Sequence, residues 1–298
     1  MKKLENFLVE KIKQSGFPLE INIGSIIKSV KPWRIYPNSY FLDKDENKGR
    51  ELDIKADIIS ADLSHLESRM RHLVDLTLLI SCKQLPGHAW IFFKDISDPY
   101  IHICRESLND IIEHHLGDPY FEVLEKKDTH FEKKDALSTN YLEIIFDDKK
   151  SNKKENNIFE SIITLIKATS FEKEEQCNET KDFIYETGVE ELLKNPFSVF
   201  NVYYPLIIFD GELYEAIIEK KILLRKVNYV LFHVEYKSGN YKGDFHIDIV
   251  KKDFFPTYFE YINNDFRIFI KRTKQRLNKL DDGLKKIMKL YVDEKKVK

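Results

Sequence analysis

The spacing of apolar and polar residues predicts the elements of the first third of the chain. Apolar residues recur at helical intervals over the first fifteen residues, and a second helical stripe runs from Leu19 to Val30. Gly16-Phe17-Pro18 separates the two stripes, because glycine frees the backbone and proline suits the first turn of a new helix. The pattern therefore predicts two consecutive helices, and Pro32 marks the end of the second.

A different period follows these helices. Residues 34–42 are rich in aromatic side chains, 43–49 form a polar turn, and residues 51–58 alternate between polar and apolar. A period of two is typical of a half-buried strand, so the two runs predict a β-hairpin. The continuous apolar run 76–80 favours a strand buried on both faces and ends at Ser81-Cys82-Lys83-Gln84.

The remaining elements are predicted in the same way. We expect a turn at Pro86-Gly87 and a short strand from Trp90 to Phe93. After them we expect a solvated loop (147–157), a helix (158–168) and an acidic surface excursion (171–191). These are followed by a buried strand (203–209) that Asp210-Gly211 closes, two more strands (227–236 and 245–250) and a terminal helix (277–291). This order predicts an α/β fold with a mixed central sheet.

Composition narrows the class of protein without choosing a function. The 298 residues are 42% hydrophobic and 33% charged, which is typical of a globular chain rather than a disordered one. The net charge of −2 gives no global attraction for nucleic acid, although a local basic face is compatible with it. Three widely separated cysteines fit a reducing cytosol and have no zinc spacing. Neither a signal peptide nor a membrane span is apparent, so we expect a cytoplasmic protein without a membrane partner.

One pair of strands carries residues suited to phosphodiester chemistry. Asp53 lies on the polar face of the alternating strand, and Ser81 and Lys83 share one face at the end of the buried strand. If these strands are neighbours, Asp53 and Lys83 converge. A carboxylate that holds a divalent cation beside a lysine suits phosphodiester hydrolysis, because the cation activates water and the ammonium stabilises developing negative charge.

These motifs resemble the PD-(D/E)xK, or restriction-endonuclease-like, superfamily. In that family a helix that often carries a glutamate precedes a hairpin that carries an aspartate, and a buried strand then ends in acid-x-Lys. The matching strings here are Ser15-Gly16-Phe17-Pro18-Leu19-Glu20, Arg50-Glu51-Leu52-Asp53-Ile54 and Ile80-Ser81-Cys82-Lys83, with fainter similarity at Tyr204-Pro205-Leu206-Ile207-Ile208-Phe209-Asp210-Gly211. The similarity is clearest over residues 15–93.

The resemblance implies a role for each matching residue. Asp53 would bind Mg²⁺ or Mn²⁺, Glu20 would be a second metal ligand, and Lys83 would be the catalytic lysine. Ser81 stands where the family has the acid of acid-x-Lys. A hydroxyl brings no charge to offset the dehydration of a hard cation, so Glu20 or Glu51 supplies the missing carboxylate or the site is impaired.

Simpler interpretations of the same residues stay open. An aspartate and a lysine at strand ends are usually solvated surface charges. Glu20 also suits the first turn of a helix, where the helix dipole favours negative charge, and Glu51 is more typical of a partner for a nearby Arg or Lys. A second acid-x-Lys, Glu235-Tyr236-Lys237, lies near Asp248 and is a rival site. It ranks lower because its aspartate follows the lysine.

Other residues give weaker indications of a functional site. His114 and His115 are adjacent and would point about 100° apart on a helix, so they make a poor metal pair. His88 is interpreted as a turn residue. The Lys- and Arg-rich end, 271–298, favours a solvated helix face, with contact to a phosphate backbone as the alternative.

The sequence therefore predicts a single domain over 1–298. Its restriction-endonuclease-like core has motifs in 15–93 and a fourth core strand at about 203–209, followed by a β-rich and helical extension at 212–298. The leading hypothesis is a metal-dependent deoxyribonuclease. The alternative is a catalytically reduced relative that binds nucleic acid or a protein. A third interpretation is an interaction protein built on the β-rich C-terminal half, in which Asp53 and Lys83 lie far apart.

Overall fold

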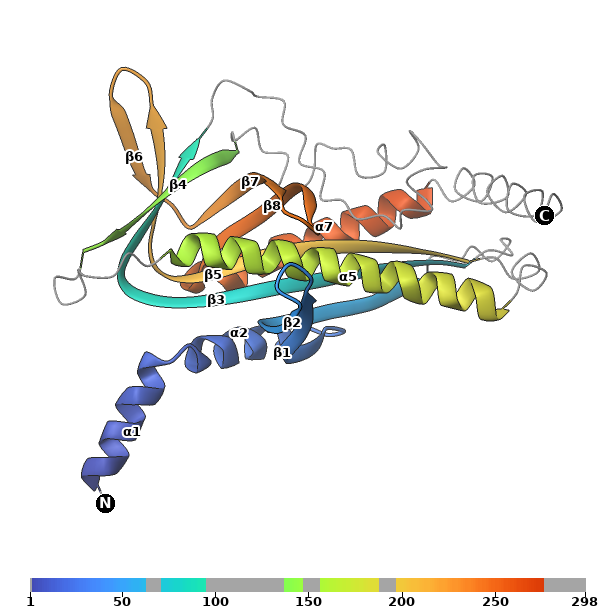
Figure 1. Ribbon diagram of the computed structural model, residues 1–298, viewed down its shortest axis with the longest axis horizontal. Coiled ribbons are helices and arrows are strands. Elements are labelled where there is room, and N and C mark those ends of the chain that lie inside the picture. The colour runs from blue at the N-terminus through green and yellow to red at the C-terminus, as the bar shows by residue number, and fades with distance from the viewer. Residues whose placement is uncertain (1, 63–70, 95–136, 147–155, 188–196, 276–298) are drawn as a thin grey trace.

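A computed structural model describes residues 2–62, 71–94, 137–146, 156–187 and 197–275. It has a mixed β-sheet flanked by helices, which confirms the α/β class (Figure 1). The elements in chain order are α1 (Lys2–Gln14), α2 (Phe17–Ser29), β1 (Arg34–Asp43), β2 (Lys48–Asp62), β3 (Arg71–Lys94), β4 (Ser138–Ile145), α5 (Asn157–Thr187), β5 (Phe197–Ile218), β6 (Ile222–Lys226), β7 (Tyr229–Lys237), β8 (Lys242–Lys251), the 3-10 turn η2 (Lys252–Phe254) and α7 (Phe255–Gln275).

Strand β3 is the centre of the sheet. Its first half pairs antiparallel with β2, its second half pairs antiparallel with β4, and β5 runs parallel to it along both halves. β5 in turn pairs in parallel with β8 and antiparallel with β6. Since β8 pairs with β7 and β7 touches β4, the pairings close a ring through β3, β4, β7, β8 and β5.

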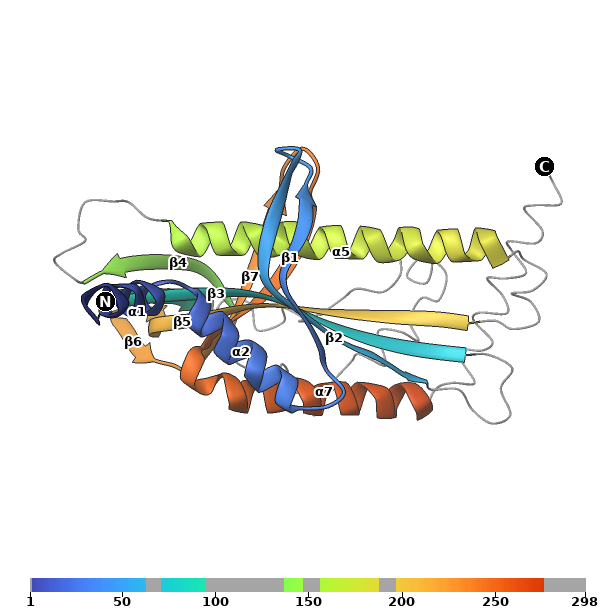
Figure 2. The same cartoon turned by 90° about the horizontal axis from the view of Figure 1, so that it is seen from below.

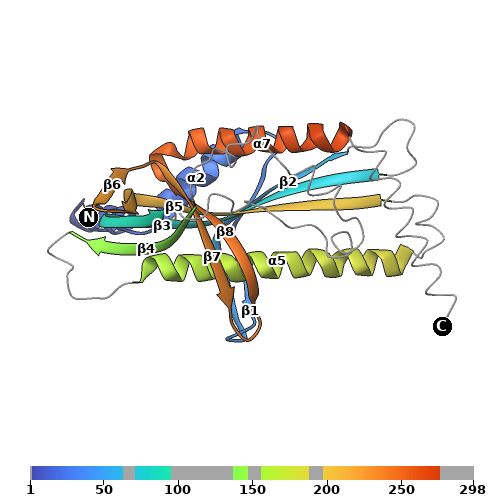
Figure 3. The same cartoon turned by 90° about the horizontal axis from the view of Figure 1, so that it is seen from above.

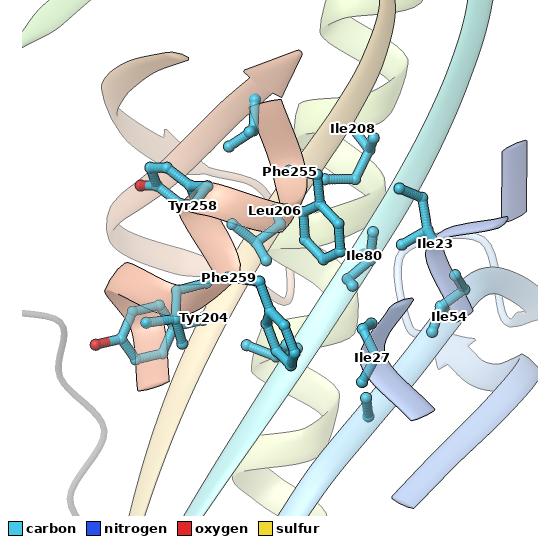
Figure 4. Packing of buried hydrophobic residues seen from close by; sticks show 14 of the residues in the cluster. Ile23, Ile27, Ile54, Ile80, Tyr204, Leu206, Ile208, Phe255, Tyr258 and Phe259 are labelled. Atoms are coloured by element: carbon cyan, nitrogen blue, oxygen red, sulfur yellow. The ribbon is translucent and has the colours of Figure 1, made fainter. Parts of the chain in front are cut away.

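Helices cover both faces of the sheet. Figure 2 and Figure 3 place α5 on one side and α2 with α7 on the other. On the second side, Ile23 and Ile27 of α2 and Phe255, Tyr258 and Phe259 of α7 pack over buried strand residues that include Ile54, Ile80, Leu206 and Ile208 (Figure 4). A separate apolar cluster lies under α5 and includes the stacked rings of Trp90 and Phe209. The apolar runs of the sequence thus lie between the two helical layers.

Three predicted boundaries are wrong. Pro86 and Gly87 do not end a strand, because β3 continues through them as a bulge where its register with β5 shifts. Asp210-Gly211 does not close β5, which extends to Ile218. The expected acidic excursion from 171 is instead a continuation of α5 to Thr187. In each case tertiary pairing or packing overrides a local signal.

Helix α7 was not predicted, although its apolar residues Phe255, Tyr258, Phe259, Ile262 and Phe266 have helical spacing and are buried. The predicted terminal helix 277–291 and the histidines 114 and 115 lie outside the described residues, as does most of the expected loop 147–157. Among the helices that the structure describes, none is long and apolar enough to cross a membrane.

Candidate functional site

Asp53 lies where β2 separates from β3. The antiparallel register of the two strands reaches Ile54 opposite Ile80 and is not continued to Asp53. At this position Asp53 contacts β3 through its side chain, because its Oδ2 accepts a hydrogen bond from the backbone N–H of Cys82 at 2.5 Å. Asp53 is therefore held against β3 beside Ser81 and Lys83, as the alternating pattern of β2 predicts.

The surroundings of Asp53 include both partner residues of the motif. Burial raises the pKa of the Asp53 carboxyl above its usual value. The Cys82 N–H, the charge of Lys83 and a hydrogen bond from Ser81 act in the opposite direction and favour the ionised form. Asp53 and Lys83 therefore lie near each other, and the wide separation that the third interpretation of the sequence expects is not observed.

Glu20 approaches the same site from the first turn of α2. Burial raises the pKa of its carboxyl, and the negative charges of Asp53 and Glu51 raise it further, while Lys83 lowers it. Gly16 leaves room for this carboxylate, because a Cβ at Gly16 would lie only 3.0 Å from Oε1 of Glu20. The Glu20 carboxylate therefore lies near two further carboxylates, those of Asp53 and Glu51, and near the ammonium of Lys83.

The two residues between these charges have different roles. Ser81 is buried, and its hydroxyl donates to Asp53 rather than adding a carboxylate at the acid position. Cys82 is also buried, and burial raises the pKa of its thiol well above the usual range, with Asp53 and Glu20 acting in the same sense. Burial of this kind disfavours the thiolate, which is the nucleophilic form, so Cys82 is poorly suited to act as the reacting group.

Carboxylates that repel one another are suited to a divalent cation. Mg²⁺ keeps several of its waters and binds proteins through one or two carboxylates, so Asp53 and Glu20 are a sufficient donor set by type and number. Within the described part of the chain, no group of three or more His, Cys, Asp or Glu side chains is arranged to hold a metal. A Mg²⁺ or Mn²⁺ ion held by Asp53 and Glu20 alone would therefore take most of its ligands from water.

The rival site is not assembled. In the antiparallel register of β7 and β8, Glu235 lies opposite Asp244 and Asp248 lies opposite Leu231. Glu235 and Asp248 are therefore four positions apart along the ladder, or about 14 Å at 3.4 Å per residue. Asp248 is buried and accepts a hydrogen bond from the Tyr258 hydroxyl at 2.6 Å, which gives it a structural role.

His88 belongs to a second polar cluster and is not a turn residue. It is buried in β3, and its Nδ1 lies 2.8 Å from Oε1 of Glu143 on β4. Glu143 also accepts hydrogen bonds from the Trp90 indole and from the backbone N–H and side chain of Asn157. The cluster joins the start of α5 to the sheet, and the contact between His88 and Glu143 spans 55 residues, so no local motif indicates it.

A third cluster holds the β1–β2 hairpin in place. Asp43 is buried and accepts hydrogen bonds from Lys167 of α5 and Arg50 of β2. Although burial opposes ionisation, these donors hold the pKa of Asp43 below its usual value. Asn240, at the turn between β7 and β8, donates to Asp45 and to the Lys44 carbonyl, so the two hairpins meet beside α5 (Figures 2 and 3).

Comparison with known proteins finds no relative of this chain. No family model, curated protein or solved structure matches the chain. The case for a function therefore depends on the geometry and chemistry of the site.

Proposed function

We propose that the chain is a metal-dependent deoxyribonuclease with a restriction-endonuclease-like core. The observation that carries the proposal is the hydrogen bond from the Cys82 N–H to Asp53, at 2.5 Å, which holds the hairpin carboxylate beside Lys83. Glu20 supplies a second carboxylate to the same neighbourhood. Two acids and a lysine that converge from a helix and two neighbouring strands are suited to the hydrolysis of a phosphodiester bond.

The order of the elements supports this fold assignment. Helix α2 carries Glu20 and precedes the β1–β2 hairpin, which carries Asp53, and β3 follows with Ser81 and Lys83. β5 then lies parallel to β3, with Phe209 in register with Lys83. This is the sequence of helix, hairpin, buried strand and later core strand that the resemblance to PD-(D/E)xK nucleases implies.

Each residue has a chemical task in the proposed reaction. Asp53 and Glu20 would hold Mg²⁺ or Mn²⁺, which when bound polarises the phosphate and lowers the pKa of a water ligand. The Lys83 ammonium stabilises negative charge that develops on the phosphate oxygens or orients the attacking water. The Cys82 N–H and the Ser81 hydroxyl fix the orientation of Asp53 and favour its ionised form against the effect of burial, which raises its pKa.

Ser81 favours one alternative function. A hydroxyl that already donates to Asp53 adds no charge for a cation, so the chain has one acid fewer than the usual motif. A relative reduced in this way would bind DNA without cutting it. The two functions differ in the outcome of a single assay, because only the nuclease converts the substrate.

The test is cleavage of supercoiled plasmid DNA by the purified chain with Mn²⁺, Mg²⁺ or EDTA. We expect nicking with Mn²⁺, weaker nicking with Mg²⁺ and none with EDTA. Asp53→Asn removes the charged ligand and should abolish nicking, whereas Asp244→Asn, at an exposed aspartate of β8, should not. Binding of DNA without nicking under every condition would select the reduced relative, and nicking by Asp53→Asn at the wild-type rate would place the reaction elsewhere.

A further inference from the structure

The end of the β5–β6 hairpin is exposed to solvent throughout. All nine residues from Ile218 to Lys226 are exposed, including every residue of β6. β6 is the last strand in the sheet order, so in the part of the chain that the structure describes its outer edge pairs with no strand. Figure 1 shows this hairpin extending away from the helical layers. We refer to residues 218–226 as the ribbon.

Positive charge is concentrated on the ribbon. Lys220, Lys221, Arg225 and Lys226 are four cations within seven residues, against one acid, Glu219, in the whole ribbon. The whole chain has a net charge of −2, so the ribbon differs sharply from the average. A compact basic element attracts a polyanion and gives binding that weakens as salt is raised.

The ribbon is anchored at its base and apolar at its tip. Five residue pairs join β5 and β6, and two ion pairs lie at the base of this ladder: Arg225 binds Glu215 at 2.7 Å and Lys226 binds Glu212 at 2.5 Å. At the tip, Ile218 and Ile222 lie opposite each other and are 61% and 69% exposed. Lys220 and Lys221 occupy the turn between them. The lysines are thus presented by a braced two-stranded element rather than by a loose loop.

We propose that the ribbon is a second DNA contact, which enters a groove of the duplex whose backbone lies at Asp53 and Lys83. The choice of DNA as the partner rests on the proposed function. The major groove admits a two-stranded β-ribbon, phosphates line its rims, and thymine methyl groups offer apolar contacts inside it. The lysines of the turn match the phosphates, and Ile218 and Ile222 match the methyl groups.

The distance along the sheet sets the length of DNA that is needed. Lys83 is in register with Phe209, and the ribbon begins nine residues further along β5 at Ile218. Nine residues extend at most about 30 Å at ~3.3 Å each. That length corresponds to about nine base pairs at 3.4 Å per pair. A duplex that reaches both places must therefore extend up to about nine base pairs beyond the site.

The test measures DNA binding separately from cleavage, with Ca²⁺ in place of Mg²⁺. Wild-type affinity should rise as a duplex is lengthened from about 8 to about 20 base pairs, because only the longer one spans nine pairs beyond the site. The double variant Lys220→Ala/Lys221→Ala should bind the longer duplex roughly tenfold more weakly at low salt. Its slope of log affinity against log salt should fall by about 1.8 for two lost phosphate contacts. The matched control is Lys48→Ala/Lys242→Ala, at two exposed lysines of other hairpins, which should bind as wild type.

The outcomes separate the ribbon from the catalytic site. If the ribbon variant binds long duplexes with wild-type affinity and salt slope, the ribbon proposal is overturned even when the wild type cuts DNA. If the wild type shows the ribbon-dependent binding but does not cut DNA, the ribbon proposal is supported and the nuclease proposal fails. Loss of binding to vesicles of anionic lipid in the ribbon variant, with DNA binding unchanged, would assign the ribbon to a membrane surface and overturn the proposal.

Discussion

Nζ of Lys167 lies 2.8 Å from Oδ1 and 2.9 Å from Oδ2 of Asp43, and both side chains are buried. This pair joins the middle of α5 to the end of β1, 124 residues away in sequence. Because β1 and β2 form the hairpin that carries Asp53, the pair helps to fix the candidate site from a distance.

Loss of one partner of this buried pair should destabilise the fold. Lys167→Met leaves the Asp43 carboxylate buried with Arg50 as its remaining cation, and breaking a buried pair in this way costs about 3–5 kcal/mol. Urea unfolding measures the loss. The comparison is Lys44→Met, whose salt bridge to Glu174 is much more exposed and should be worth less than about 1 kcal/mol. Equal small losses in both variants would remove the structural role given to Lys167.

Glu20 should lower the stability of the free protein at neutral pH. Its pKa is raised by burial and by Asp53 and Glu51, so ionisation costs more in the folded chain than in the unfolded one. Stability therefore falls as the pH rises through the usual carboxyl range and beyond. Glu20→Gln should raise the melting temperature at pH 7–8 by a few degrees. This gain should shrink as the pH falls and vanish at about pH 3, where wild-type Glu20 is protonated in both the folded and the unfolded chain.

Melting scans across this pH range, with and without Mn²⁺, check the prediction for Glu20. Mn²⁺ should raise the wild-type melting temperature at pH 8, and it should raise that of Glu20→Gln less, because a ligand has been lost. A gain from Glu20→Gln that is the same at every pH would show that electrostatic repulsion is not its cause.

Ser81 determines how tightly the site can hold a cation. With two carboxylates, Mn²⁺ should bind more tightly than Mg²⁺, since affinity rises along the transition series. Ser81→Glu replaces a hydroxyl that donates to Asp53 with a third carboxylate, which should cost about 1–3 kcal/mol of stability without metal. It should raise metal affinity in a calorimetric titration. Lower stability with no gain in affinity would mean that no cation binds beside Asp53.

The hydrogen bond between Tyr258 and Asp248 should matter for the fold and not for DNA cleavage. Asp248 is buried against Tyr258 of α7, and removal of the tyrosine hydroxyl by Tyr258→Phe should cost about 1–2 kcal/mol. At a temperature where the variant is folded, its rate of plasmid nicking should equal that of the wild type. Loss of nicking in folded Tyr258→Phe would restore the rival site on β7 and β8.

The pairing of the strands that carry Asp53 and Lys83 follows from the sequence more directly than the lengths of the elements do. The period of two in β2 and the apolar run of β3 place Asp53 and Lys83 on neighbouring strands, because both patterns are local. The extension of α5 is not local: Glu172 binds Lys55 at 2.5 Å and Phe171 packs against Phe41, so its acidic turns are stabilised by the sheet. Likewise, β3 continues through Pro86 and Gly87 because β4 and β5 flank it beyond that point.

The single-turnover rate of DNA nicking by Lys83→Ala with Mn²⁺ is the sharpest test of the proposed nuclease site. Lys83 supplies the positive charge beside Asp53, and removal of one such transition-state contact typically slows a reaction by about 10²–10³-fold. We expect a loss of that size in a variant that melts within a few degrees of wild type, while the exposed-lysine control Lys242→Ala nicks normally. Nicking by Lys83→Ala at the wild-type rate would contradict the proposed site.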